Sequence, residues 1–236
     1  MEYFIPEDSA SSNETHLRRA RQLTTEPLNT TDDIPFTRHE IQAAREKFDP
    51  RKAPGEDAIN SKVLFRAFRN FPTLFTEVYN ECLKNGHFPK YWKRSIIHPI
   101  VKPEKELSEM HKYRPISLIN TGGKLLEKLL IDRINHHLHT NKSLNSNQFG
   151  FTPQKSTVDA AMAAKQYALS HIQKKNYFIM ISLDIQGAFD SANWDSILNN
   201  LRTLKCRRNL YELVRSYFSD RVAILHTNTN TEQKEK

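Results

Sequence analysis

Apolar residues recur with the spacings of helices and strands from residue 36 onward. Thr37 and Glu40 have the positions of a helix-capping box. Ile41, Ala44 and Phe48 follow at spacings of three and four, which predicts a helix after Thr37. The same spacing predicts further helices near residues 63–68, 74–83, 121–138, 194–204 and 210–218. Ser156 and Asp159 repeat a helix start signal, which predicts a helix that runs to about Lys174.

Four segments are predicted to be strands because they are rich in apolar and β-branched residues: 95–102, 113–119, 177–183 and 221–227. Pro99 restricts the first of them to an edge or bulged position. The run 177–183 is continuously β-rich and suits a buried central strand that ends at Asp184. This mixture of many helices and few strands predicts an α+β fold.

The polar and charged residues divide the chain at residue 35. Residues 1–35 are rich in Ser, Thr, Asn, Asp and Glu, so a flexible linker is expected there and an ordered domain over residues 36–236. The whole chain has a net charge of +8, from −4 in residues 1–35 and +12 in the remainder. A basic body suggests a polyanionic partner, most often nucleic acid, although lysine-rich faces are also common on proteins without one.

Composition excludes several classes of protein. No apolar run exceeds five residues, far below the roughly 20 that a membrane-spanning helix needs. The N-terminus, MEYFIPEDSA, lacks the basic and apolar regions of a secretory signal, so an intracellular protein of the nucleus or cytoplasm is expected. The two cysteines, Cys82 and Cys206, are far apart and are predicted to be buried thiols, neither a disulfide nor a zinc site.

The segment from Ser182 to Asp190 is the most informative for chemistry. An acidic residue at the end of a buried strand, here Asp184, lies where a polar ligand can reach it. Mg²⁺ prefers carboxylate oxygens, and the main-chain oxygen of Ile185 could add a further ligand. The residues alone leave open whether Asp184 binds metal or caps the turn before the next helix.

Several separated stretches resemble the reverse transcriptases of non-LTR, LINE-like retrotransposons of the type-1 group. They occur in the order and spacing of that family and cover most of the chain. The stretches are Lys52–Asp57, Trp92 with Ile97–Pro103, Tyr113–Leu118, Gly123–Glu127, Gln148–Phe151, Ser156–Thr157 and Leu183–Asp190.

The resemblance implies a right-hand polymerase fold, with fingers over residues 36–176 and the start of the palm over 177–236. It implies an RNA-directed DNA polymerase acting on an RNA template, a DNA primer and deoxynucleoside triphosphates. By the same resemblance, Asp184 matches the first catalytic aspartate, which holds both Mg²⁺ ions of the complete domain. Two such ions stabilise the attacking and leaving oxygens of phosphoryl transfer.

Three residues match nucleotide-binding positions of the family. Lys102 and Arg114 match basic residues that reach the triphosphate, as suits a lysine point charge and a bidentate guanidinium. Phe189 matches the ring that excludes a ribose 2′-hydroxyl. Without the resemblance, Lys102 and Arg114 read as solvated strand-edge charges and Phe189 as core packing.

Four further residues match the template side. Gln148, Phe149 and Phe151 match a segment that lines the template, where aromatic rings can stack on bases. Lys52 could contact template phosphates. Burial beneath a hairpin, for the first three, and simple exposure, for Lys52, are the alternatives that the residues leave open.

The second metal-binding motif of the family, an aromatic residue followed by x-Asp-Asp, has no counterpart among these 236 residues. The only Asp-Asp pair is Asp32–Asp33, in the expected linker. We therefore expect a polymerase domain truncated before its second carboxylate motif. The alternatives are a catalytically dead nucleic-acid-binding remnant and a helical interaction domain with no nucleic-acid role.

Overall fold

The computed structural model describes residues 24, 26, 28–49, 51–101, 113–185 and 192–226, together with the backbone of residues 231–235. The chain divides into two compact units, residues 1–137 with 190–236 and residues 138–189. The first unit contains the sheet and most of the helices. The second contains α6 (Thr157–Gln173) and the segment that follows it.

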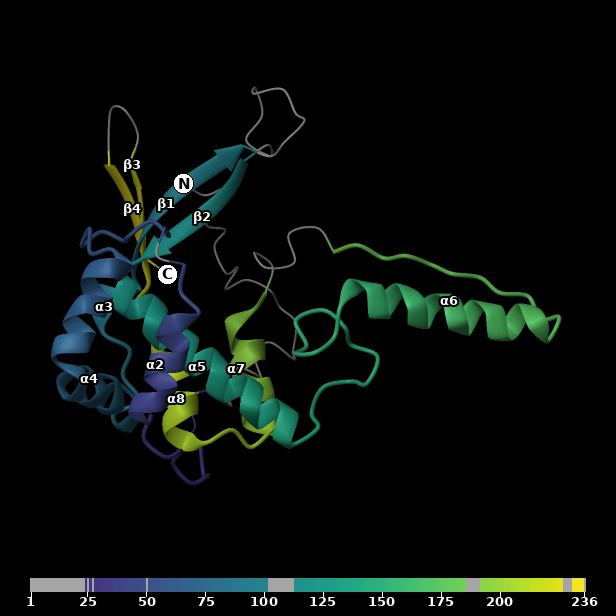
Figure 1. The fold of residues 1–236 in the computed structure, drawn as a ribbon, viewed down its shortest axis with the longest axis horizontal. Coiled ribbons are helices and arrows are strands. Elements are labelled where there is room, and N and C mark those ends of the chain that lie inside the picture. The colour runs from purple at the N-terminus through teal and green to yellow at the C-terminus, as the bar shows by residue number, and fades with distance from the viewer. Residues whose placement is uncertain are drawn as a thin grey trace. The chain divides into compact units, whose positions relative to one another are not determined.

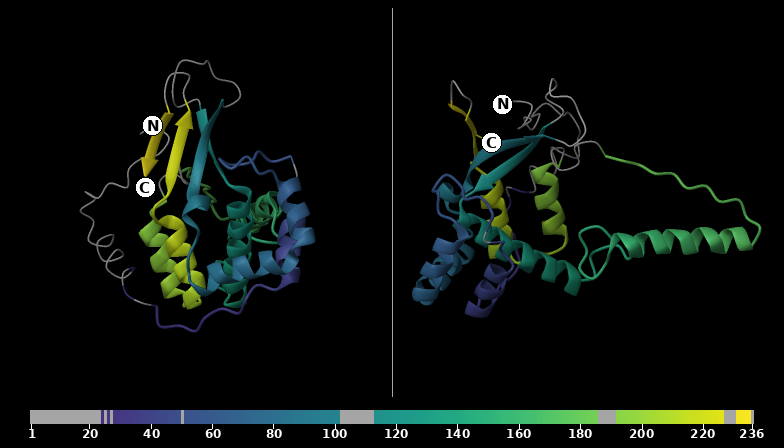
Figure 2. Two further views of the ribbon diagram at one scale, coloured as in Figure 1. Left: turned by 90° about the vertical axis from the view of Figure 1, so that its left-hand side faces the viewer. Right: turned by 45° about the horizontal axis from the view of Figure 1, so that its top comes forward.

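The first unit contains a mixed sheet with the strand order β2-β1-β3-β4 (Figures 1 and 2). Its strands are β1 (Arg94–Val101), β2 (Tyr113–Ile119), β3 (Val222–His226) and β4 (Thr231–Glu235). β1 and β2 are antiparallel from Ser95 to Val101, whereas β3 runs parallel to β1 only beside Arg94–Ile96. Pro99 therefore lies where β1 has a neighbour on one side only, which agrees with the predicted edge position.

Helices gather at one end of this sheet, and the strands project away from them (Figures 1 and 2). Near-complete burial of large apolar side chains holds the helices together, and each such side chain contributes roughly 1.5–3 kcal/mol. The first half of β1 joins this core, whereas its second half is exposed. The helical elements are α2 (Arg38–Glu46), α3 (Ser61–Asn70), α4 (Pro72–Lys84), η1 (Lys90–Lys93), α5 (Thr121–Thr140), α7 (Trp194–Thr203) and α8 (Arg208–Phe218). The core includes Ile41, Phe88, Leu126, Leu210, Tyr211 and Leu213.

Local capping signals start two of the helices where the sequence predicts. The Thr37 hydroxyl accepts a hydrogen bond from the amide of Glu40, whose carboxylate accepts one from the amide of Thr37. Ser156 and Asp159 form the same reciprocal pair at the start of α6. Each capping box satisfies two amides that a helix N-terminus otherwise leaves unpaired.

The expected flexible linker is wrong for residues 28–35, which together with Phe36 we call the N-terminal strap. The strap is bonded to the helical body at both ends and at its middle. Asp33 exchanges two hydrogen bonds with the side chain of Asn209 on α8, at 2.7 and 3.1 Å. Phe36, which is 2% exposed, exchanges two with Asn80 on α4, at 2.6 and 3.0 Å. An Asn side chain that pairs with both the amide and the carbonyl of one residue replaces a strand neighbour, which explains why a polar segment is ordered here.

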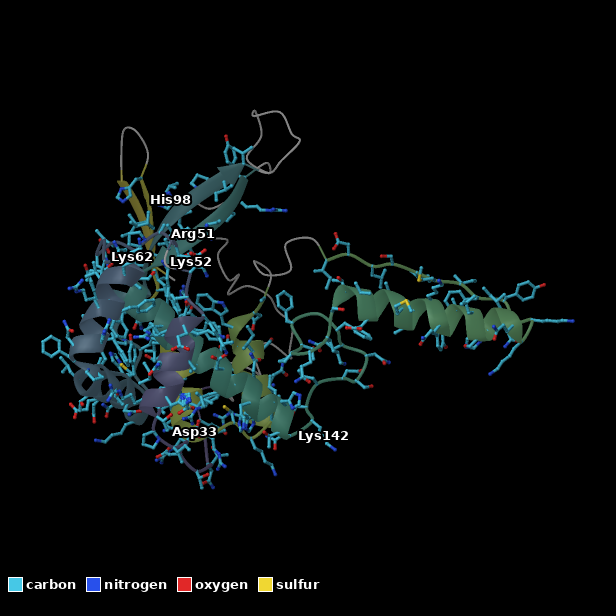
Figure 3. The ribbon with its side chains drawn as sticks, in the orientation of Figure 1. Asp33, Arg51, Lys52, Lys62, His98 and Lys142 are labelled. Atoms are coloured by element: carbon cyan, nitrogen blue, oxygen red, sulfur yellow. The ribbon has the colours of Figure 1, made fainter. Side chains whose placement is uncertain are left out.

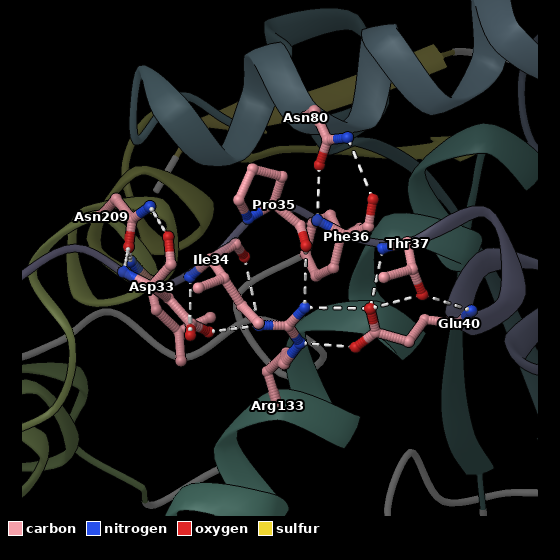
Figure 4. Close-up of polar contacts among 10 residues, drawn as sticks. Asp33, Ile34, Pro35, Phe36, Thr37, Glu40, Asn80, Arg133 and Asn209 are labelled. Atoms are coloured by element: carbon pink, nitrogen blue, oxygen red, sulfur yellow. Dashed lines mark hydrogen bonds and ion pairs between the residues drawn. The ribbon is translucent and has the colours of Figure 1, made fainter.

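Arg133 on α5 anchors the middle of the strap (Figure 4). Its guanidinium donates to Asp33 at 2.8 Å and to both carboxylate oxygens of Glu40, at 2.8 and 3.0 Å. It also donates to the main-chain oxygens of Ile34 and Pro35, each at 3.2 Å. All these acceptors fit the planar fork of arginine, which lysine cannot reproduce.

The second unit departs most from the sequence prediction. Residues 177–183 form no strand and pair with no described residue. Except for the half-buried Phe178, their side chains are exposed, including Ile179 at 83% and Leu183 at 88%. α6 likewise buries none of its residues. The prediction of a buried central strand is therefore wrong for this chain, because a strand requires a neighbour to satisfy its backbone groups.

Candidate functional site

The Lys52 loop, which comprises residues 51–60 between α2 and α3, is held by the start of α5. Lys124 Nζ donates a hydrogen bond of 2.6 Å to the main-chain oxygen of Ala53. The side-chain oxygen of Asn120, just before α5, accepts a 3.2 Å hydrogen bond from the amide of Asp57. The loop thus has main-chain contacts on both sides of Gly55.

Two further contacts tie the Lys52 loop to its surroundings. Arg94, at the start of β1, donates to both carboxylate oxygens of Glu56, at 2.6 and 3.0 Å. This hydrogen-bonded guanidinium lowers the pKa of Glu56, although partial burial opposes the shift. The Thr121 hydroxyl donates to the main-chain oxygen of Ile59. The loop is therefore bonded to two places in the fold, the start of α5 and the start of β1.

Arg51 and Lys52, the first two residues of the loop, are both exposed cations, and Figure 3 labels them. Arg51 forms a bidentate ion pair with Asp49, with both distances 3.1 Å. Among the described residues, no side chain accepts a hydrogen bond from Lys52, which is exposed. Lys52 is thus the cation of this pair that is available to an outside anion.

Arg114, the described member of the predicted triphosphate-binding pair, lies on β2 opposite Ile100. Alternation along the strands places it on one face with His98, Ile100 and Ile116, and all four are exposed. Its partner Ile100 is six residues after Arg94 on β1, which at the rise of a strand separates Arg114 from Arg94 by roughly 20 Å along the hairpin. The fold therefore presents Arg114 far out on the hairpin and does not bring it to the Lys52 loop.

The loop that precedes α6 carries the predicted template-side residues of the second unit. Lys155 closes it, with Nζ 3.0 Å from the main-chain oxygen of Gln148 and 5.0 Å from the ring centroid of Phe149. Phe151 is 89% exposed and has a positive φ of 56°, which is unusual for a bulky side chain. The alternative of buried packing is therefore wrong for Phe151.

Asp184 and Ile185 lie in the exposed segment after residue 177, not at the end of a buried strand as predicted. No three His, Cys, Asp or Glu side chains gather into a metal site within the described ranges. The residues present therefore offer a divalent cation one exposed carboxylate, fewer donors than it needs. Lys102 and Phe189 lie outside the described residues.

The structure confirms the prediction that the two cysteines are buried thiols. Cys82 and Cys206 are buried free thiols, and burial raises the pKa of each to about 11. A thiol with so high a pKa is a poor nucleophile and metal ligand at neutral pH. Of the helices in the described part of the chain, none is both long and apolar enough to cross a membrane.

Sequence reasoning missed two polar groups near the Lys52 loop, the buried Asn120 and the half-buried Glu127. Asn120 is fully buried and links the loop to the main-chain oxygen of Tyr91. Glu127 accepts a hydrogen bond from the Tyr217 hydroxyl, and burial raises the pKa of Glu127. The only signal for them was a polar residue at a position that the apolar pattern assigns to the interior.

Comparison with known proteins gives a consistent result. A family model described as reverse transcriptase (RNA-dependent DNA polymerase) matches residues 100–236. The chain is 32% identical over 188 residues to the RNA-directed DNA polymerase from mobile element jockey of Drosophila funebris, covering 79% of this chain and 20% of that protein.

Two other relatives have a similar extent of match. The jockey polymerase of Drosophila melanogaster is 29% identical over 92% of this chain and 23% of its own length. The Pol polyprotein of the type-1 retrotransposable element R1 of Bradysia coprophila is 31% identical over 72% of this chain and 17% of its own. The chain thus spans about a fifth of the length of the relatives that it matches.

Proposed function

The chain belongs to the reverse transcriptase (RNA-dependent DNA polymerase) family, and on that premise we propose that it is part of the RNA-directed DNA polymerase of a non-LTR retrotransposon. Its substrates would be an RNA template, a DNA primer and deoxynucleoside triphosphates. It would act inside the cell, in the nucleus or cytoplasm, where such templates occur. The observation that carries the proposal is the family match, because Arg114 and Asp184 both lie within the matched residues.

Residues of the first unit and of the loop before α6 would bind the substrates. Residues 36–176 would be the fingers and residues 177–236 the start of the palm. Lys52 would contact template phosphates, while Gln148, Phe149 and Phe151 would line the template. The exposed ring of Phe151 supports its role as a stacking surface for bases.

Arg114, Lys102 and Phe189 would contact the incoming nucleotide. The exposed guanidinium of Arg114 supports its part, because phosphate oxygens can reach it and accept two parallel hydrogen bonds. Phe189 would exclude ribonucleotides by a steric clash. Lys102 would add a point charge near the triphosphate.

Asp184 and the main-chain oxygen of Ile185 would be ligands of a divalent cation, with Mg²⁺ favoured because both donors are oxygens. When bound, two such ions would stabilise the attacking primer hydroxyl and the leaving pyrophosphate. Among the described residues, Asp184 is the single carboxylate of this set.

Primer–template binding and primer extension together test the proposal. The chain should bind a labelled RNA–DNA primer–template at near-physiological salt, and Lys52→Ala should weaken binding more than Lys84→Ala, its control on α4. Both variants remove one positive charge, so the comparison separates a formed site from bulk attraction. The chain alone should incorporate no nucleotide in the presence of Mg²⁺.

Each outcome distinguishes among the candidate functions. Equal weakening by Lys52→Ala and Lys84→Ala indicates a remnant that binds nucleic acid through net charge alone. No binding at all supports an interaction domain without a nucleic-acid role. Robust incorporation that Asp184→Ala abolishes would refute the expectation that this chain is inactive by itself.

A further inference from the structure

We propose that Asn120, Lys124 and the Arg94–Glu56 ion pair are positioning groups that hold the Lys52 loop in one shape, and that this shape lets Lys52 grip an RNA phosphate. The inference rests on the proposed function, since it names the groups that prepare the predicted template contact. It assigns these groups no contact with RNA of their own.

The loop needs outside support because it contains no helix or strand. A loop of this kind samples many conformations unless its backbone groups find fixed partners. Here the partners lie on rigid elements: Arg94 on β1, Asn120 at the β2–α5 junction and Lys124 in the first turn of α5. Lys124 contacts Ala53, Arg94 contacts Glu56 and Asn120 contacts Asp57, so all three contacts fall within five consecutive residues.

Asn120 is the buried group that fixes the position of the loop. Its amide group donates 3.2 Å to the oxygen of Tyr91 and accepts 3.2 Å from the amide of Asp57, so both ends of the side chain are used. Gly55 packs directly against it: a Cβ atom at residue 55 would lie 2.5 Å from the main-chain nitrogen of Asn120. A fully buried amide with both ends bonded accepts one loop geometry and rejects others.

Charge at the loop favours an anion as the ligand. Burial lowers the pKa of Lys124, the carboxylates of Glu127 and Asp57 oppose the shift, and repulsion from Lys52 adds to it. A phosphate beside Lys52 would relieve this repulsion. Arg51 is paired with Asp49, so Lys52 is the cation of the two that would bind a phosphate.

The double variant Glu56→Gln/Arg94→Gln tests the inference, because it removes the ion pair without changing the net charge. Its matched control, Glu81→Gln/Lys84→Gln, removes an exposed pair of 3.2 Å on α4. Lys52→Ala is made in the wild-type chain and in both backgrounds. Two quantities are measured: hydrogen exchange of the Asp57 amide, and the affinity for a fluorescein-labelled oligouridine as a function of salt.

In the wild type and in the control background, Lys52→Ala should weaken binding about fivefold and reduce the salt slope by about 0.7, the value for one phosphate contact on a single strand. With Glu56 and Arg94 replaced, the Asp57 amide should exchange at least about tenfold faster. Lys52→Ala should then change affinity less than about twofold, because a mobile loop loses its contact. If the Arg94–Glu56 ion pair served stability alone, its removal would leave the effect of Lys52→Ala on affinity unchanged.

The failures are distinguishable. If Lys52→Ala has no effect in the wild type, the template contact itself is wrong and the inference is overturned with it. If Lys52→Ala costs as much in the Glu56→Gln/Arg94→Gln background as in the wild type, the positioning role alone is refuted. Unchanged exchange of the Asp57 amide in that background likewise refutes it, because the loop then holds its shape without the ion pair.

Discussion

Replacing Arg133 by Met should destabilise the first unit by about 3 kcal/mol. The substitution keeps the apolar stem of the side chain and removes every hydrogen bond of its guanidinium. Asp33 and Glu40 then lose their cation, and two main-chain oxygens of the N-terminal strap lose a donor (Figure 4).

The magnitude follows from how deeply each group is buried. Removing one partner of a buried ion pair costs about 3–5 kcal/mol, because the other charge remains without compensation. The Arg133 side chain is 11% exposed and that of Asp33 is 17% exposed, but that of Glu40 is 39% exposed. Water can therefore solvate Glu40 in part, so the lower end of the range applies. The loss includes the cation–π contact of Arg133 with Phe36, at 5.2 Å.

Urea unfolding at neutral pH measures this loss, with Arg208→Met as the control. Arg208 also pairs with a carboxylate of the same segment, Asp32, but their side chains are 56% and 44% exposed. An exposed pair contributes at most about 1 kcal/mol, so Arg208→Met should change stability little. Equal losses for the two variants would refute the reasoning that burial, and not the number of ion pairs, sets the cost.

The pH dependence gives a second measure of the same contact. Burial raises the pKa of Glu40, but hydrogen bonds from Arg133 and Thr37 outweigh it and hold the pKa below 4.5. A carboxyl with a lowered pKa in the folded state contributes stability above its unfolded pKa, and this is lost as the pH falls through the folded pKa. Arg133→Met should therefore flatten the loss of stability below about pH 4.5. A loss as steep as that of the wild type would show that Arg133 does not set the pKa.

Two substitutions near the α5 start test other features of the fold. Gly55→Ala should cost about 2 kcal/mol of stability, because the added Cβ would overlap the backbone of Asn120. The control Gly150→Ala should be nearly neutral, because its Cβ meets nothing within 4 Å. Equal urea midpoints for the two variants would contradict this packing. Glu127→Gln should raise the urea midpoint at neutral pH, because burial raises the pKa of Glu127 and its favourable contribution is lost as the pH rises through that value. The gain should vanish in acid, where both side chains are neutral, and a lower midpoint at neutral pH would show that the charged form is the stabilising one.

Helix positions were predictable from the sequence because their causes are local. Thr37 and Glu40 contact each other across three residues, and so do Ser156 and Asp159. The apolar spacing that follows each pair places one face inward wherever the helix lies. By contrast, β4 was missed because its sequence, Thr-Glu-Gln-Lys-Glu, has no apolar alternation; it pairs with β3 through backbone groups that every residue has.

The candidate site divides in the same way. The resemblance to reverse transcriptases predicts substrate contacts for Lys52, Arg114 and Phe151, and the fold leaves each of these side chains exposed. It gave no reason to single out Asn120, whose role depends on a contact between residues 63 positions apart. A contact over that separation leaves no periodic trace in the sequence.

The sequence by itself determined the family, the helices and the cations that face outward, because motifs, caps and spacing act over a few residues. Only the tertiary structure decided that the N-terminal strap is ordered and that residues 177–183 are not a strand. Both outcomes depend on whether a backbone segment finds partners for its amides and carbonyls. The polar strap finds Asn80, Asn209 and Arg133, whereas the apolar run, despite its strand-like composition, finds none among the described residues.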